Sequence, residues 1–182
     1  AYMPWLLSFS MDHDAPKIFA DTRLYRESAM EFMFSSSTDY RKFRAKGSKL
    51  IVYTGGADPV FSANYHLKWY RRLAAENSGV ERTQKFARLF VVPGMNHCGG
   101  GPSTSQFDAF SSLVQWVEND AEPDSIVATA PAGTPWPART RPLCPYPAYA
   151  KYKGTGSIEL AESFKCEVDH NHGHHHGHHH RD

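Results

Sequence analysis

The chain has 182 residues, of which 41% are hydrophobic and 13% aromatic, enough apolar side chains to bury the core of one domain. Its 20 lysines and arginines nearly balance its 19 aspartates and glutamates, and no basic stripe predicts a nucleic-acid partner. No apolar run approaches the roughly 18 residues that a membrane-spanning helix needs, so we expect no membrane partner either.

The first residues predict that this sequence begins in the middle of a longer chain. Residues 1–19, AYMPWLLSFSMDHDAPKIF, have no initiator methionine. They also lack the basic segment and the cleavage site after it that a signal peptide has. The apolar patch from Trp5 to Phe9 would therefore find its partners upstream. Residues 21–34 are predicted to be helical, and the polar loop SSSTDY and the short segment RKFRAKG follow them.

Next comes a strand, a loop and a helix. Leu50 to Tyr53 form a short apolar run that includes β-branched residues and stops at Gly55, which predicts a buried strand ending in a tight loop. Ser62 is placed to cap the following helix with its hydroxyl. One face of that helix carries apolar and aromatic side chains at helical spacing, and the helix is expected to end at 77–79. These face residues are His66, Trp69, Tyr70 and Leu73.

The same plan is repeated downstream. RLFVVP predicts a second strand, GMNHCGGGP a loop, and STSQFDAFSSLVQWVEND a capped helix. The buried face of this helix is predicted to consist of Phe107, Phe110, Val114 and Val117. Strands that alternate with helices predict an α/β fold, a parallel sheet with crossover helices and both faces covered. Ligands of such sheets bind at the carboxyl ends of the strands, here the loops 54–62 and 93–104.

Beyond Pro123 the pattern becomes irregular. The proline-rich segment APAGTPWPARTRPLCPYPAY predicts a stretch that wraps the surface. The end of the chain, HNHGHHHGHHHRD, contains eight of the eleven histidines and is too biased in composition to form a core. We therefore expect residues 169–182 to be a disordered tail.

The two loops each offer one group of an acid–base pair. Asp58 follows the first strand and His97 the second, and neighbouring strands lie only about 4.8 Å apart. A carboxylate that accepts from one imidazole nitrogen leaves the other nitrogen free to act as a base. The alternative is structural, because Asp-Pro is common turn chemistry and a single loop histidine usually has no catalytic role.

The nucleophile that would complete this pair is missing from the sequence. No G-x-S-x-G motif occurs, Ser48 precedes the strand, and Ser62 is better explained as a helix cap. The order of acid and then base on the last strands of a parallel sheet is that of α/β-hydrolases, whose serine comes earlier in the chain.

The three cysteines leave two interpretations open. Cys144 and Cys166 lie at a spacing that suits a disulfide closing a loop, which would imply an oxidising compartment and would leave Cys98 unpaired. Three reduced thiols in a cytosolic protein are the alternative. A zinc site at His97 and Cys98 is not favoured, because adjacent residues rarely bind one ion and no further ligand pair accompanies them.

Residues 38 to 167 resemble the C-terminal part of the tannase and feruloyl esterase family of α/β-hydrolases. The signature P-G-M-x-H-C-x-G-G, the loop A-D-P after the first strand, and the ending RPLCPYPAYAKYKGTGSIELAESFKC carry the resemblance. It implies that Asp58 is the catalytic acid and His97 the general base. It also implies a disulfide from Cys98 to a cysteine upstream of residue 1, beside the serine, and a late disulfide between Cys144 and Cys166.

The resemblance also divides the chain. It implies that 1–37 return from a lid domain to the core, that 38–128 carry the acid and base strands, and that 129–168 form the disulfide-stapled wrap. The lid, with a structural calcium, and the nucleophile half of the fold are then missing from this sequence, and the chain itself holds no cofactor. Where many relatives carry His-Gly-Trp, this chain has Thr54-Gly55-Gly56, which would alter the wall of the pocket.

The function expected from this resemblance is that of a secreted or periplasmic serine ester hydrolase. Its substrates would be small esters of aromatic acids, its partner would be the upstream part of the same protein, and the chain alone would be inactive. Two other functions remain open: a hydrolase-like binding module without catalysis, and a metal-binding protein that uses the histidine-rich tail.

Overall fold

A computed structural model describes residues 2–169 of the chain and divides it into two compact units, Ala1–Ser37 and Thr38–Asp182. The smaller unit contains the helices α1 (Tyr2–Ser8) and α2 (Ala29–Met33) and the 3-10 helix η1 (Ala15–Phe19). All the buried apolar residues of the described chain belong to the larger unit. Within the smaller unit, large apolar side chains such as Leu7 and Leu24 are exposed.

The predicted helix over 21–34 is wrong for most of its length. Helix α2 begins only after Ser28, whose hydroxyl accepts a hydrogen bond from the Glu31 amide while the Glu31 carboxylate accepts one from the Ser28 amide. This capping box fixes the start of the helix late in the segment, because it satisfies two amides that would otherwise lack partners.

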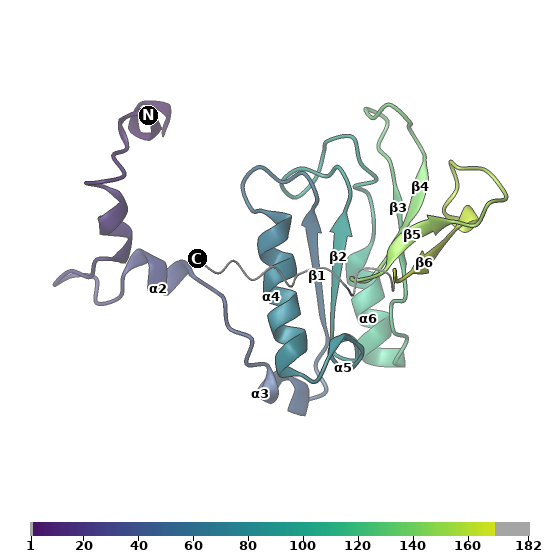
Figure 1. The fold of residues 1–182 in the computed structure, drawn as a ribbon, viewed down its shortest axis with the longest axis horizontal. Coiled ribbons are helices and arrows are strands. Elements are labelled where there is room, and N and C mark those ends of the chain that lie inside the picture. Colours follow the sequence, from purple (N-terminus) through teal and green to yellow (C-terminus); the bar gives the residue numbers. More distant parts are fainter. Residues whose placement is uncertain (1, 170–182) are drawn as a thin grey trace, which may run out of the picture. The chain divides into compact units, whose positions relative to one another are not determined.

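The larger unit is built on two parallel strands, β1 (Leu50–Gly55) and β2 (Ala87–Val92), which lie side by side in Figure 1. Their register pairs Leu50 with Ala87 and Gly55 with Val92, so both strands end at the same edge. Helices α4 (Ala63–Glu76) and α5 (Val80–Gln84) connect them, α3 (Arg41–Ala45) precedes them, and α6 (Ala109–Asn119) follows. The predicted parallel strand–helix–strand plan is present.

The two faces of this sheet belong to two separate apolar clusters. On one face Leu89 packs with Tyr70 and Leu73 of α4. On the other face Phe90 and its neighbours pack against residues at the start of α6. Successive residues of a strand point to opposite faces, so the apolar run from Leu89 to Val92 in β2 is explained by cover on both sides.

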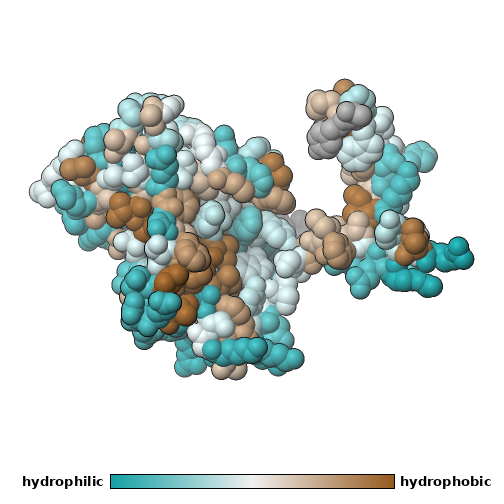
Figure 2. All heavy atoms as spheres, turned by 180° about the vertical axis from the view of Figure 1, so that it is seen from behind, coloured by the Kyte–Doolittle hydropathy of each residue, from teal (hydrophilic) through white to brown (hydrophobic). Residues whose placement is uncertain are grey.

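Strand β1 is less buried than expected, since the Tyr53 side chain is 49% exposed. The face predicted for the helix α6 is half right: Phe107 and Val114 are partly buried, and Phe107 packs against the core, but Phe110 and Val117 are exposed. Trp116 is the helix residue that is fully buried. Figure 2 shows that apolar side chains gather in a patch on one face of the larger unit. None of the helices in the described chain is long and apolar enough to pass through a bilayer.

The cap predicted for α4 is present in position but not in its hydrogen bond, and the helix α6 is capped as predicted. Ser62 occupies the position before α4, but its side chain makes no capping hydrogen bond. At α6 the cap is Asp108, whose carboxylate accepts a hydrogen bond from the Ser111 amide at 2.8 Å. Helix α4 ends at Asn77, as predicted.

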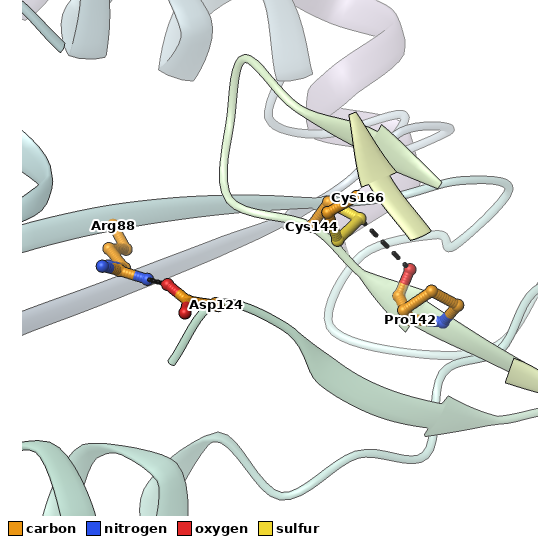
Figure 3. Close-up of a disulfide and its surroundings, with 5 residues drawn as sticks. All are labelled: Arg88, Asp124, Pro142, Cys144 and Cys166. Atoms are coloured by element: carbon orange, nitrogen blue, oxygen red, sulfur yellow. Dashed lines mark hydrogen bonds and ion pairs between the residues drawn. A yellow bond between two sulfur atoms is a disulfide. The ribbon is translucent and has the colours of Figure 1, made fainter. Parts of the chain in front are cut away.

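The C-terminal stretch is more regular than predicted. Strands β3 (Ile126–Thr129) and β4 (Thr140–Leu143) pair antiparallel, as do β5 (Tyr149–Tyr152) and β6 (Phe164–Glu167), and the short 3-10 helix η2 (Ala161–Ser163) leads into β6. A disulfide joins Cys144 to Cys166 with their Cα atoms 5.5 Å apart (Figure 3). Proline and turn residues separate these strands, which is why the sequence reads as irregular.

One buried cation ties this stretch to the sheet. Arg88 of β2 is 3% exposed, and its guanidinium contacts the carboxylates of Glu122 and Asp124 and lies over the Trp116 ring, 5.3 Å from its centroid. Figure 3 shows the contact with Asp124. The segment that leaves α6 is thereby held against β2 before it enters β3.

Replacing Arg88 by alanine should lower the free energy of unfolding by about 2 kcal/mol, because Glu122 would keep only the exposed Lys85 as a partner and Trp116 would lose the guanidinium over its ring. Urea denaturation of the natural protein that carries this sequence measures the change. The matched control is Arg82→Ala, since Arg82 is exposed on α5, and should leave stability within about 0.5 kcal/mol. Equal losses in the two variants would contradict a role for the buried guanidinium.

Candidate active site

The acid loop follows β1 directly and is organised by the carboxylate of Asp58. Its Oδ1 accepts hydrogen bonds from the amides of Val60 and Phe61, at 2.7 and 2.9 Å. This is the turn chemistry that Asp-Pro predicts, but it uses only one carboxylate oxygen. The second oxygen remains available to a partner from another loop.

The base loop leaves β2 through Pro93 and Gly94 and folds back on itself. Gly94 has φ +71° and Gly101 has φ +72°, and a methyl group on either would lie 2.4 Å or less from a carbonyl oxygen of the opposite side of the loop. Only glycine allows this close approach at a positive φ. The fold-back presents His97 at the tip of the loop.

The structure brings the two predicted groups together. His97 Nδ1 lies 3.0 Å from Asp58 Oδ2, with the carboxylate side chain 6% exposed and the imidazole 44% exposed. The strands place their loops side by side, and the main chain joins these loops through hydrogen bonds from the Gly56 amide to the Val92 carbonyl and from the Ala57 amide to the Met95 carbonyl.

The protonation of the pair follows from the carboxylate. Burial raises the pKa of Asp58, but the hydrogen bonds from the Phe61 amide, from His97 and from the Val60 amide outweigh burial and lower the pKa to about 2. An ionised carboxylate can only accept, so a neutral His97 carries its proton on Nδ1 and donates it to Oδ2. The Nε2 atom is then free to accept a proton from a third group.

This arrangement has a defined pH range. A carboxylate with a lowered pKa stabilises the fold fully above its unfolded pKa, roughly 3.9, and loses that contribution as the pH falls through about 2. Asp58 is therefore ionised throughout the neutral range, and its orienting effect on His97 is constant there.

Two further side chains frame the imidazole. The ring of Phe61, which the sequence does not single out, lies 5.2 Å from the His97 ring, centroid to centroid. Cys98 is an exposed free thiol with φ +61°, and its Sγ lies 3.8 Å from His97 Nδ1. The signal that the sequence offers for Phe61 is its place as an apolar residue in the loop that carries Asp58.

The predicted site residues thus separate into two places. Asp58, His97 and Cys98 lie together at the strand ends, whereas Cys144 and Cys166 form their disulfide in the C-terminal stretch. No group of three or more histidines, cysteines or carboxylates that could hold a metal occurs among residues 2–169. The histidine-rich segment 170–182 lies outside the described residues.

A carboxylate-oriented imidazole at the carboxyl ends of adjacent parallel strands is the placement of acid and base that α/β-hydrolases have. Two solved structures share this fold: an esterase from Aspergillus oryzae (TM-score 0.63, 30% identity, 72% of this chain and 29% of that one) and feruloyl esterase B from the same organism (TM-score 0.63, 26% identity, again 72% and 29%).

The sequence comparison agrees. The family model for tannase and feruloyl esterase matches residues 8–167, and the chain belongs to this family. It is 46% identical over 165 residues to mono(2-hydroxyethyl) terephthalate hydrolase from Piscinibacter sakaiensis. That match covers 88% of this chain but 26% of the relative, so the chain spans about a quarter of the relative's length.

The closeness of the two loops depends on Gly55. A methyl group there would lie 2.3 Å from the Met95 carbonyl oxygen and 2.5 Å from that of Asn96, so a side chain at this position would push the His97 loop away from Asp58. Met95 and Asn96 are backbone neighbours of His97, and their displacement would lengthen the Asp58–His97 hydrogen bond.

Gly55→Ala should therefore lower the free energy of unfolding by roughly 1–3 kcal/mol and weaken the downfield proton resonance of His97 Nδ1 in the NMR spectrum. Gly133→Ala is the control, because a methyl group at Gly133 meets no atom within 4 Å. An unchanged Nδ1 resonance in Gly55→Ala would show that the loops hold the pair without this close contact.

Proposed function

We propose that this chain is the C-terminal part of a serine carboxylic ester hydrolase that cleaves esters of aromatic acids. The observation that carries the proposal is the hydrogen bond between the ionised Asp58 and His97, in a chain of the tannase and feruloyl esterase family. The substrate class is supported by the similarity to mono(2-hydroxyethyl) terephthalate hydrolase and to feruloyl esterase B. Secretion or a periplasmic location is supported by the Cys144–Cys166 disulfide.

In this mechanism His97 moves the protons. Its Nε2 accepts the proton of a serine hydroxyl as the serine oxygen bonds to the ester carbonyl carbon. The same nitrogen then gives that proton to the departing alcohol oxygen as the ester C–O bond breaks, which leaves an acyl-serine. Water attacks the acyl-serine with the same help and releases the acid. Asp58 holds the ring and stabilises the imidazolium at both stages.

The serine belongs, in this proposal, to an upstream part of the protein that packs against β1. Within residues 2–169, β1 pairs with β2 alone, so its other edge is open to a further strand. Between β1, the His97 loop and α6 lies a hollow of about 420 Å³ whose lining includes Ile51, Tyr53, Phe110 and Cys98. Apolar side chains around a free thiol favour a protein segment that covers the hollow and carries a cysteine for Cys98.

The lid and its calcium site would belong to the same upstream part, and residues 1–37 would lead back from it. Without the serine the chain alone would be inactive. No observation on the described residues favours either a binding module without catalysis or metal binding by the tail, and the segment 170–182 that would bind metal lies outside them.

The function is tested by assaying the natural protein that carries this sequence with methyl ferulate, methyl gallate and mono(2-hydroxyethyl) terephthalate. His97→Ala should lower kcat at least ~10³-fold, since the base is lost. Asp58→Asn should lower it by about 10⁴-fold, as in serine proteases, because an amide favours the wrong imidazole tautomer.

The control is His13→Ala, because His13 is an exposed histidine of the smaller unit that bonds only to Ser10 in the structure. It should retain the rate of the unchanged protein. A His97→Ala variant that hydrolyses all three esters at the original rate would show that the proposed base is wrong.

The disulfide proposed for Cys98 has its own test. Non-reducing peptide mapping of the natural protein by mass spectrometry should find Cys144 linked to Cys166 and Cys98 linked to a cysteine of an upstream peptide. The bond would clamp the loops of nucleophile and base, where a drift of about 1 Å can cost on the order of a hundredfold in rate. Recovery of Cys98 as a free thiol would refute the clamp.

A further inference from the structure

A second hollow of about 400 Å³ lies on the other side of the His97 loop. Its walls come from Gly94 in the loop after β2, from the loop before β4, and from β4, β5 and β6, which lie together at one end of the larger unit in Figure 1. Asp58 and His97 are not among the described residues that line it. It is therefore separate from the candidate active site.

The walls of this hollow pair aromatic rings with guanidinium groups. Arg139 lies over the ring of Trp136, with 4.5 Å from Cζ to the ring centroid, and Arg141 of β4 lies over the ring of Phe164 of β6 at 4.2 Å. Tyr149 of β5 adds a third aromatic ring that is 45% exposed. Stacking of this kind fixes the orientation of the planar guanidinium groups.

The two arginines differ in what neutralises them. Arg139 donates from Nε and Nη2 to the two carboxylate oxygens of Glu159, both at 2.6 Å, so its charge is already paired. Arg141 donates from Nη1 to the Thr140 carbonyl, and within residues 2–169 it forms no salt bridge. Burial and the charge of Arg139 lower the pKa of Arg141, although the nearby Glu159 carboxylate acts in the opposite direction. Arg141 remains a cation at neutral pH.

Arg141 is partly buried and has no carboxylate of its own, because both oxygens of Glu159 accept hydrogen bonds from Arg139. Such a guanidinium attracts an anion into the hollow. A carboxylate matches the fork of N–H donors of Arg141, and a flat ring matches the aromatic walls. The volume is in the range of sites for small ligands, which begins at roughly 300 Å³.

We propose that this hollow binds an aromatic carboxylate, with the carboxylate on Arg141 and the ring between Trp136 and Tyr149. The proposal goes beyond the esterase function and does not depend on it, because it uses neither Asp58 nor His97. The products of the proposed reaction are aromatic acids, so such a ligand would be present wherever the enzyme works.

Benzoate is the probe, and the natural protein that carries this sequence is titrated with it by calorimetry and by tryptophan fluorescence. Benzoate should bind with one site at the hollow and change the emission of Trp136, so that Trp136→Phe removes the fluorescence change. Benzamide, which has the same shape without the charge, should bind at least tenfold more weakly. Inorganic phosphate, which has charge without a ring, should also bind at least tenfold more weakly.

Arg141→Gln should weaken benzoate binding at least tenfold while leaving ester hydrolysis unchanged, and Arg82→Gln on the exposed face of α5 should bind as the unchanged protein does. If Arg141→Gln unfolds, Arg141→Lys keeps the charge and should still bind at least about fivefold more weakly, because an ammonium lacks the planar fork. Benzoate binding that is unaffected by both Arg141 variants, or equal binding of benzamide, would overturn the proposal.

Discussion

The parallel pairing of β1 with β2 is the constraint on which the site depends. Because Gly55 is in register with Val92, the two strands stop at the same edge, and the loops that follow meet within hydrogen-bond distance. The close contact of Gly55 with the Met95 carbonyl then sets how near the loops can come. A register shifted by one residue would place Asp58 and His97 on loops of different height, and their side chains would not meet.

The acid–base pair could be predicted from the sequence because each of its members follows a strand with a clear apolar pattern. The alternative for Asp58, a turn residue, is also correct, since its Oδ1 makes the turn and its Oδ2 the contact with His97. The two interpretations describe different oxygens of one carboxylate. Giving Asp58 either a structural or a catalytic role alone would miss that its two oxygens have different partners.

The error at the helix α6 has a physical cause. Phe110 and Val117 were expected in the core because apolar residues at helical spacing usually face one, yet both are exposed here and Trp116 is buried among Lys49 and Arg88. The pattern of a sequence reports which faces become buried in the natural protein. It does not report which segment buries them. A helix can therefore carry a second apolar face that stays exposed within residues 2–169.

The exposed apolar side chains of β1 and α6 surround one hollow, and β1 has one unpaired edge within residues 2–169. Tyr53 on β1, Phe110 on α6 and Cys98 all line this hollow. Cys98 lies three residues after Met95, whose carbonyl oxygen is in close contact with Gly55. A strand that paired with the free edge of β1 would extend the sheet beyond two strands, and in the proposed function the loop after it would cover the hollow beside Cys98. On the proposed function, the serine and the cover for these exposed side chains would both come from one further strand and its following loop.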